Sequence, residues 1–391
     1  MRVAYVSADQ GVPVFGQKGC SIHTQEVLRG LSRQGAEVEL FSTRCEGEPP
    51  EDLRTIRLHP LPRPTQPDVA LREQVSLVGN LALGAELEAA GPFDLVYERY
   101  SLWSFAAMEF ARDAGVTGML EVNAPLIEEQ ATYRVLVDRP AAEAVAERTF
   151  GAASLLLAVS GQVAAYLEEF PSARGKVRVV PNAVRTERFH EGVEPALPAS
   201  DGVFTVGFVG TLKAWHGVEV LLEAFAQIQA NHKAVRLLIV GDGPERAKLV
   251  ARCVELKVAD EVVFTGAVAP SEVPAFLASM DVAVAPYPNL ARFYFSPLKV
   301  YEYMAAGLPV VASGIGQLEE LIEPGVNGLL VMPGDAKALK GALETLQADV
   351  GLRRRLGHAA RAKVLHKHTW DSVARHILEL AGASKLEMPP V

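Results

Sequence analysis

One stretch of the sequence decides the class of fold: DVAVAPYPNLARFYFSPLKVYEYMAAGLPVVAS, residues 281–313. It begins with DVAVAP and ends with LPVVAS, two short apolar runs that are typical of strands buried on both faces of a sheet. Between them, Ser296 is a good N-cap and Pro297 suits the first helical position, so a helix is expected near 297–306. A strand, a helix and a second strand in this order predict a parallel α/β unit.

The same alternation runs through both halves of the chain. Apolar runs are separated by segments in which apolar residues have helical spacing, as in 21–34. A charged segment rich in Pro and Gly at 182–203 interrupts the pattern and is typical of a linker. The strand candidates are VAYV (3–6), DLVYERY (94–100), GMLEV (118–122), SLLLAV (154–159), TVGFVG (205–210), VRLLIVG (235–241), EVVFTGAV (261–268), DVAVAP, LPVVAS and GLLVM (328–332).

The length of the chain favours two domains, because single hydrophobic cores stop growing near roughly 250–300 residues and this chain has 391. We expect an α/β protein with two Rossmann-like, doubly wound domains that face each other across a cleft, since such domains bind ligands beyond the carboxyl ends of their strands. The predicted parts are a first domain at 1–185, a linker at 186–203, a second domain at 204–367 and a C-terminal helix at 368–391.

Composition and charge exclude several classes of protein. Apolar residues make up 49% of the chain and charged residues 22%, which excludes a disordered, collagen-like or coiled-coil protein. The net charge of −9 argues against a dedicated nucleic-acid binder. The three cysteines lie far apart, which argues against disulfides and thiolate zinc sites and suits a reducing cytosol: Cys20, Cys45 and Cys253.

The sequence also predicts a cytoplasmic location. The N-terminal residues MRVAYVSAD lack the apolar stretch of a signal peptide. No run reaches the roughly 20 apolar residues that span a bilayer. Arg54, Arg57 and Arg63 lie near a Pro-rich loop and leave peripheral membrane contact open, although a solvated face explains them better.

The start of the helix near 297–306 is a candidate anion site. Its unpaired N–H groups favour an anion, and Lys299 adds a positive charge in the first turn, where a cation is otherwise unfavourable. Glu302 shares a helix face with Lys299, and a carboxylate there can accept hydrogen bonds from two ribose hydroxyls. A plain capped helix with a Lys–Glu surface pair is the alternative.

Two further segments follow strand candidates in the second half. In GFVGTLKAWHG (207–217), Lys213 and His216 follow a strand that ends at Gly210, where they can bind a pyrophosphate or simply be solvated. LLIVGDGPE (237–245) lacks the third glycine of a dinucleotide fingerprint, and no acidic residue ends the next strand, so NAD binding is poorly supported. Its glycines favour either a close approach of the backbone to a nucleotide or a tight turn.

Polar residues follow strand candidates in the first half as well. Glu98–Arg99 and Glu121–Asn123 stand at the ends of two strands, and His23 lies early in a helix that follows a loop ending near Gly19. Such groups usually face the crevice, which indicates acceptor binding, although helix caps and salt bridges between loops explain them equally well. No H-E-x-x-H, G-x-S-x-G or Walker motif and no acidic cluster with metal spacing is present, so no metal is expected.

Taken together, these segments resemble the retaining glycosyltransferases of family 4, which have the GT-B fold. The resemblance runs nearly end to end and implies a nucleotide-diphospho-sugar donor bound mainly by the second domain. It also implies an acceptor bound mainly by the first domain, and a final helix that crosses back to it. The motifs that carry it, in order, are VVPNAVRTERF (179–189), GFVGTLKAWHG, LLIVGDGPE, VVFTGAV (262–268), residues 296–313 and GQLEELIEPGVNGLLV (316–331).

Residue by residue, the resemblance implies three groups of contacts. The catalytic residues that stabilise the departing diphosphate are Lys213, His216 and Lys299. The donor contacts are Gly210, Thr211, Gly243, Val268, Tyr294, Ser296, Pro297, Leu298 and Glu302. The contacts on the acceptor or sugar side are Gly19, His23, Glu121 and Asn123.

The sequence departs from the family pattern at several positions. The family often has two Glu residues separated by seven others; Glu302 matches the second, whereas Tyr294 stands in place of the first. Thr211 and His216 stand where many relatives have Arg and Lys. A His that is common at the donor sugar in the first domain is replaced near 121–123.

The expected function is that of a metal-independent, cofactor-free transferase of carbohydrate biosynthesis that moves a hexosyl-type sugar with retention of configuration. Its substrates are a nucleotide sugar and a sugar or small-molecule acceptor, whose hydroxyl can lose its proton to a donor phosphate oxygen. One alternative is a nucleotide-sugar epimerase or hydrolase on the same fold. The other is a non-catalytic GT-B-fold partner protein. The sugar, the base, the acceptor, the linkage and the oligomeric state are left open.

Overall fold

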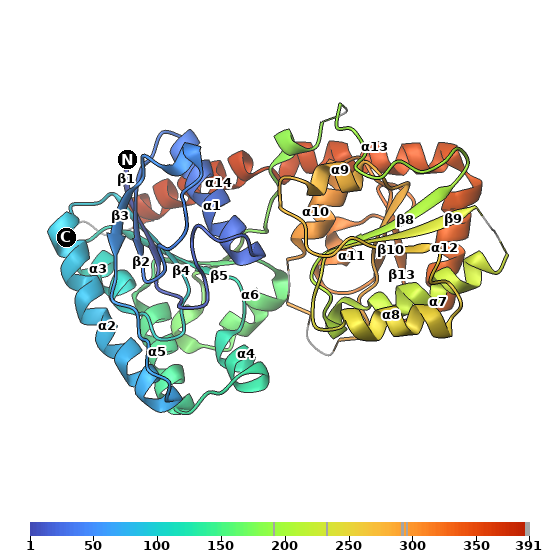
Figure 1. Ribbon diagram of the computed structural model, residues 1–391. Helices are drawn as coiled ribbons and strands as arrows, with labels where there is room; N and C mark the ends of the chain where they lie inside the picture. The colour runs from blue at the N-terminus through green and yellow to red at the C-terminus, as the bar shows by residue number, and fades with distance from the viewer. Residues whose placement is uncertain (191, 232–233, 291–292, 295, 388–391) are drawn as a thin grey trace. The chain divides into compact units, whose positions relative to one another are not determined.

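The computed structural model describes residues 1–190, 192–231, 234–290, 293–294 and 296–387 (Figure 1). The last four residues of the predicted C-terminal helix, 388–391, lie outside this description. The chain divides into two compact units. The first unit consists of Met1–Asn182, Tyr294–Ser296 and Trp370–Val391, and the second of Ala183–Phe293 and Pro297–Thr369.

In the described part of the first unit, a parallel sheet has seven strands in the order β3-β2-β1-β4-β5-β6-β7 (Figure 1). The strands are β1 (Arg2–Ser7), β2 (Glu37–Ser42), β3 (Arg57–Pro60), β4 (Leu95–Arg99), β5 (Thr117–Val122), β6 (Leu155–Ala158) and β7 (Val177–Val179). The helices are α1 (Gly19–Arg33), α2 (Val69–Ala90), α3 (Ala106–Asp113), α4 (Leu126–Tyr133), α5 (Arg139–Ala152), α6 (Gly161–Glu168) and α14 (Trp370–Glu387), with short 3-10 turns at Glu51–Leu53 and Pro171–Ala173.

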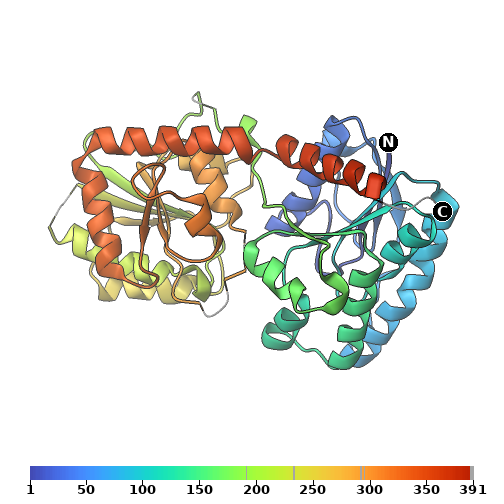
Figure 2. The same ribbon diagram turned by 180° about the vertical axis from the view of Figure 1, so that it is seen from behind.

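Helices cover both faces of this sheet, which is why its central strands are apolar on both sides. On one face, Val96 and Leu120 form a buried core with Leu87 of α2, Met108 of α3 and Phe150 of α5. On the other, α14 packs along α1, as Figure 2 shows for the red and blue helices. The final helix is therefore part of the first unit.

The second unit has the same architecture. Its described residues form a six-stranded parallel sheet in the order β10-β9-β8-β11-β12-β13. The strands are β8 (Phe204–Val209), β9 (Val235–Val240), β10 (Val262–Phe264), β11 (Val282–Ala285), β12 (Val310–Ser313) and β13 (Leu329–Val331). The helices are α7 (Val218–Gln229), α8 (Arg246–Glu255), α9 (Val273–Leu277), α10 (Leu298–Ala305), α11 (Gln317–Leu321), α12 (Ala336–Ala348) and α13 (Val350–Lys367), with 3-10 turns η3 (Thr186–Arg188) and η4 (Ala214–His216). The predicted α/β class with two Rossmann-like sheets is confirmed.

The start of α10 differs from the sequence-based prediction. The helix begins at Leu298 with Pro297 as its N-cap residue, and no side chain caps it. Ser296, predicted to be the cap, instead accepts a hydrogen bond through its hydroxyl from the backbone N–H of Asn182, at 3.3 Å. The prediction of Ser296 as N-cap is therefore wrong, because the helix begins one residue later than predicted and the Ser296 hydroxyl contacts a distant backbone N–H.

Two helical glycines of the second unit provide a matched test of packing. A Cβ atom at Gly357 in α13 would lie 2.0 Å from the Gly307 carbonyl oxygen, whereas one at Gly341 in α12 would meet nothing within 4 Å. We expect Gly357→Ala to destabilise the protein by about 1–3 kcal/mol through overpacking. We expect Gly341→Ala to stabilise it by about 0.4–1 kcal/mol, because the unfolded chain loses freedom. Urea unfolding of both variants tests this, and equal midpoints would contradict the close contact.

Candidate functional site

In the second unit, strands β8 and β9 are each followed by a glycine, Gly210 and Gly241, and the backbones of these glycines touch. The Gly210 N–H donates to the Val240 carbonyl at 2.9 Å. A Cβ atom at Gly241 would lie 2.1 Å from the Gly210 carbonyl oxygen, and one at Gly243 would lie 2.5 Å from the Leu212 carbonyl oxygen. The glycines of LLIVGDGPE are expected to allow either a close approach to a nucleotide or a tight turn. Backbone packing at a tight turn is sufficient to explain Gly243.

The ammonium group of Lys299 lies beside this edge, against two aromatic rings. Its Nζ is buried, 4.4 Å from the ring centroid of Phe208 and 5.4 Å from that of Tyr287. It makes no hydrogen bond to any residue that the structure describes. Burial lowers the pKa of Lys299 to about 7, against the opposing charge of Glu302. Because an unpaired buried ammonium is costly, its position at the start of a helix favours an anion site.

His216 is held in one orientation by the loop that follows β8. Its Nδ1 lies 2.5 Å from the Thr211 carbonyl oxygen. A carbonyl only accepts hydrogen bonds, so Nδ1 carries the proton and Nε2 of the neutral ring is an acceptor. Burial, together with the charges of Lys299 and Lys213, lowers the pKa of His216 to about 3. At neutral pH the ring can therefore donate to an anion only after it takes up a second proton.

The structure brings together the three basic residues that the sequence predicts to act on a diphosphate. Lys213 lies 4.5 Å from the ring centroid of Trp215, next to His216 in the same loop. The loop turns at Gly217, whose φ is 69°, and a Cβ atom there would lie 1.8 Å from the Pro286 carbonyl oxygen. Only glycine fits this turn, so the positions of both basic side chains depend on it.

Glu302, predicted to bind ribose, lies one turn after Lys299 on α10 and is paired with Arg188. Its Oε1 is 3.4 Å from Arg188 Nη1, and the Arg188 guanidinium also donates to the Pro270 carbonyl. Sequence reasoning missed Arg188, because it stands in a charged stretch 114 residues before Glu302. No local pattern in the sequence reports such a pair.

Two of the predicted donor contacts, Tyr294 and Ser296, group with the first unit. The Tyr294 carbonyl accepts a hydrogen bond from the Ser160 hydroxyl at 2.9 Å, and the Tyr294 hydroxyl lies 3.4 Å from Glu129 Oε2. The remaining predicted contacts differ in burial: Thr211 is exposed, Val268 and Leu298 are half-buried, and Pro297 is buried.

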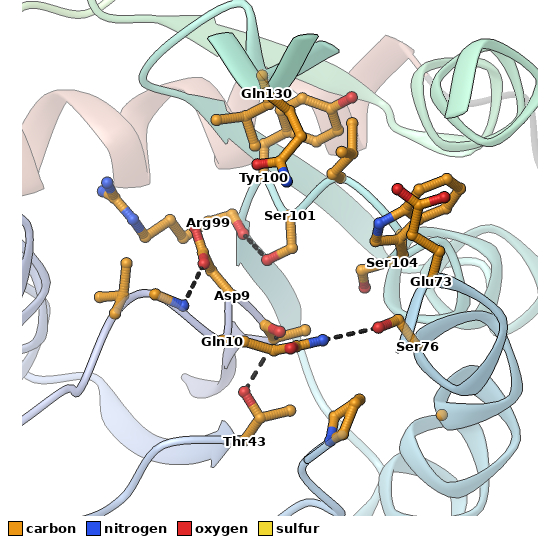
Figure 3. Close-up of a pocket in the computed structure, with 18 of the residues that line it drawn as sticks. Asp9, Gln10, Thr43, Glu73, Ser76, Arg99, Tyr100, Ser101, Ser104 and Gln130 are labelled. Atoms are coloured by element: carbon orange, nitrogen blue, oxygen red, sulfur yellow. Dashed lines mark hydrogen bonds between the residues drawn. The ribbon is translucent and has the colours of Figure 1, made fainter. Parts of the chain in front are cut away.

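A cavity of about 740 Å³ opens in the first unit, where β1, β4 and β5 end (Figure 3). Gln10 Nε2 donates to Ser76 Oγ at 2.7 Å across one side of it (Figure 3). Its size and its mixed polar and aromatic lining suit a small polar molecule. Residues that line it include Asp9, Gln10, Ser76, Arg99, Tyr100, Ser101, Trp103, Asn123, Gln130 and Arg134.

Sequence reasoning found few of these residues. Asp9 and Ser101 lie just beyond the ends of β1 and β4, and that position is a signal by which they could have been found. Ser76 and Gln130 lie within α2 and α4 and carry no such signal.

The predicted acceptor-side residues separate into three places. Asn123 lines the cavity, and Gly19 is exposed at the start of α1. His23 and Glu121 instead belong to a buried network in which Glu121 lies 2.7 Å from His23 Nε2 and accepts from the Tyr97 hydroxyl at 2.6 Å. Burial raises the pKa of Glu121, but the charges of His23 and Arg99 and the Tyr97 hydroxyl outweigh it, and the pKa is about 2.

This network supports the packing of α14. The His23 ring meets the ring of Trp370, the first residue of α14, edge to face at 5.0 Å. The salt-bridge interpretation therefore explains His23 and Glu121 directly, and Asn123 connects them to the cavity through its hydrogen bond to Glu121.

The described residues contain no group of three or more His, Cys, Asp or Glu side chains placed to hold a metal ion. Within the same residues, every helix is too short or too polar to cross a membrane.

Two family profiles match the chain. The one described as glycosyltransferase family 4 matches residues 18–188, and the one described as glycosyl transferases group 1 matches residues 203–349. A D-inositol 3-phosphate glycosyltransferase of Acidothermus cellulolyticus is 27% identical over 96% of this chain and 89% of its own length. An uncharacterized glycosyltransferase of Methanocaldococcus jannaschii is 29% identical over 54% of this chain; the match spans 55% of that protein.

Solved structures share the fold. The sucrose-phosphate synthase of Thermosynechococcus elongatus has a TM-score of 0.74 at 23% identity and covers 98% of both chains. HepE of Anabaena, in complex with UDP, has a TM-score of 0.69 at 20% identity and covers 98% of this chain and 100% of its own. At these identities the likeness shows the fold alone, and the fold is GT-B.

The unpaired ammonium gives a test of pH dependence. The pKa of Lys299 is about 7 in the folded protein and 10.5 ordinarily, so between these values the unfolded chain binds more protons and stability rises with pH. Lys299→Met removes this effect, which amounts to about 1.4 kcal/mol per pKa unit. We expect the variant to melt at a higher temperature than the unmodified protein near pH 6, and the difference to shrink toward pH 9. A difference that is constant with pH would contradict a buried, unpaired amine.

Proposed function

Because the chain belongs to the family 4 glycosyltransferases, which transfer a sugar from a nucleotide-sugar donor with retention of anomeric configuration, we propose that it uses a UDP-hexose donor without a metal ion. Uridine is chosen because HepE, on the same fold, occurs in complexes with UDP and with UDP-glucose. The metal-free mechanism rests on the basic residues at the edge of the second sheet.

The observation that carries the proposal is the buried Lys299 ammonium, which has no hydrogen-bond partner in the part of the chain that the structure describes. When the bond between the sugar C1 and the phosphate oxygen breaks, the bond electrons stay on the diphosphate, which gains negative charge. A preorganised cation in a site shielded from water stabilises such charge more than it could in bulk water. Lys299 also contacts the faces of Phe208 and Tyr287, which keep it in place before the donor arrives.

The other residues divide the remaining tasks. Lys213 adds a second positive charge beside the diphosphate. His216, neutral in the free protein, takes up a proton near the diphosphate and then donates from Nε2. Glu302 accepts hydrogen bonds from the ribose hydroxyls. The acceptor oxygen attacks C1 from the face that the diphosphate leaves, and its proton passes to a phosphate oxygen of that leaving group, so no separate base is needed.

The acceptor binds in the cavity of the first unit. Its hydroxyl, carboxamide and aromatic lining suits a polyhydroxylated ring. Relatives of the chain are named for acceptors of this kind: D-inositol 3-phosphate in A. cellulolyticus and 2-deoxystreptamine in Streptomyces kanamyceticus, the latter in a protein 29% identical over 71% of this chain. We therefore infer a sugar or cyclitol acceptor.

The function is tested by incubating the protein with UDP-glucose, UDP-galactose and UDP-N-acetylglucosamine, each with a panel of sugars and cyclitols. Transfer with the α-configuration retained, read from the anomeric proton by NMR, is the expected result. A new UDP-sugar formed without any acceptor would establish the epimerase instead. Binding of UDP without any turnover of donor would establish a non-catalytic protein.

Lys299 and Glu302 are expected to affect different kinetic constants. Lys299→Met removes a charge that acts mainly on the leaving group, so kcat should fall about 100- to 1,000-fold. Glu302→Gln weakens a contact to ribose that changes little during the reaction, so the donor KM should rise about tenfold while kcat stays nearly constant. Steady-state kinetics with UDP-sugar as the varied substrate measures both. Unchanged constants in both variants would remove the donor from this helix.

Activity is also expected to survive chelation. The charge of the diphosphate is met here by side chains and N–H groups, so an excess of EDTA should leave the rate of donor turnover unchanged. The measurement compares rates with EDTA, with EDTA followed by Mg²⁺ or Mn²⁺, and with neither. Loss of activity that a metal restores would contradict the metal-free mechanism.

A further inference from the structure

Residues 183–189 open the second unit, and hydrogen bonds hold this segment against α10 and α13. The Val184 N–H donates to the His368 carbonyl at 3.0 Å, just after the end of α13. Arg361 of α13 donates both to the Phe189 carbonyl and to the Ala305 carbonyl at the end of α10. These contacts fix the backbone on both sides of η3, the turn that carries Arg188.

Among the described residues, three groups lie around the Arg188 guanidinium and together define its position. Nη1 lies 3.4 Å from Glu302 Oε1, and Nη2 donates to the Pro270 carbonyl in the segment after β10. The Phe189 ring centroid lies 5.3 Å from Cζ. The side chains of Arg188 and Glu302 are 20% and 23% exposed, so water screens this pair only in part.

We propose that Arg188 is a positioning residue for the nucleotide: it holds the Glu302 carboxylate in the orientation that accepts hydrogen bonds from the ribose hydroxyls. The proposal rests on the proposed function, in which Glu302 binds ribose. A free carboxylate on a flexible Glu side chain loses rotamer freedom when it binds, and a partner that has already fixed it removes part of that cost.

A second consequence of the pair concerns Lys299. Glu302 follows Lys299 by three residues on one helix face, which is the spacing of an intrahelical ion pair. In the structure, Glu302 instead forms an ion pair with Arg188. The Lys299 ammonium has no hydrogen-bond partner among the described residues. Arg188 thus keeps the carboxylate directed at ribose and leaves the lysine charge available for the diphosphate.

The experiment measures the affinity for UDP and 2′-deoxy-UDP by calorimetry in the full chain. The variants are Arg188→Ala, Arg188→Lys, Glu302→Gln and the double variant of Arg188→Ala with Glu302→Gln. Arg252→Ala is the matched control, because it removes the same charge from a partly exposed residue of the second unit that pairs with Glu223 and Glu255. Circular dichroism and melting temperature check that each variant is folded.

We expect Arg188→Ala to weaken UDP binding about tenfold, which corresponds to about 1.4 kcal/mol. Arg188→Lys should recover part of the loss, since lysine keeps the charge but not the fork of donors. In the Glu302→Gln background, Arg188→Ala should cost nothing further, because no carboxylate remains to be positioned. The loss caused by Arg188→Ala should be smaller for 2′-deoxy-UDP, and Arg252→Ala should bind UDP as the unmodified protein does.

The outcomes separate this inference from the proposed function. If Glu302→Gln weakens UDP binding but Arg188→Ala does not, the positioning role is overturned and the donor site stands. If Arg188→Ala weakens both nucleotides equally, with and without Glu302, its role is structural and the inference is also overturned. If Glu302→Gln binds UDP normally, or the unmodified protein binds no UDP, the placement of the nucleotide itself is overturned, and the inference with it.

Discussion

Neighbouring strands in both sheets run parallel, so the chain must leave every strand at the same edge of its sheet and return through a connection. In the second unit this requirement gathers the segments after β8, β9 and β11 at one edge. The contact between the Gly210 and Gly241 backbones leaves no room there for side chains from the strand ends themselves. The candidate basic side chains therefore come from the loop that carries His216 and from the first turn of α10. In the first unit the same constraint opens the cavity beyond β1, β4 and β5.

Most of the sheet architecture could be predicted from the sequence, because burial on both faces leaves a local record of continuous apolar residues. A buried polar residue interrupts the apolar run, and the strand can then no longer be recognised from the sequence. Strand β2 contains Glu39, which the structure buries through an ion pair with Arg2 and a contact of 2.8 Å to His59. Ser296 fails for a related reason: its local pattern is that of a helix cap, but its hydrogen-bond partner Asn182 is 114 residues away. A local sequence pattern can indicate hydrogen-bond partners nearby in the chain, but not partners that are distant in sequence.

In the candidate site, too, local features could be predicted from the sequence and features that depend on distant residues could not. Lys213, His216 and Lys299 could be selected as candidates because each follows a strand or opens a helix, and such positions are visible in the sequence. Their ionisation states could not be predicted, because these depend on burial by elements far apart in the chain. The Lys299 ammonium, for example, is shielded from water by Phe208 of β8 and by Tyr287. The charge arrangement also lowers stability, since a buried amine without a hydrogen-bond partner among the described residues is destabilising. In the proposed function, binding of the diphosphate offsets this cost.

The first unit is not continuous in sequence: its last helix, α14, follows the whole of the second unit and packs on α1 through Trp370, His23 and Gly30. During synthesis on the ribosome, all residues of the second unit up to Thr369 emerge before α14 does. The domain that begins the chain is therefore the last to be completed, which reverses the usual N-terminal-first order of cotranslational folding. Until then, the apolar face of α1 lacks its cover, and an interrupted translation product would expose it to chaperones and proteases.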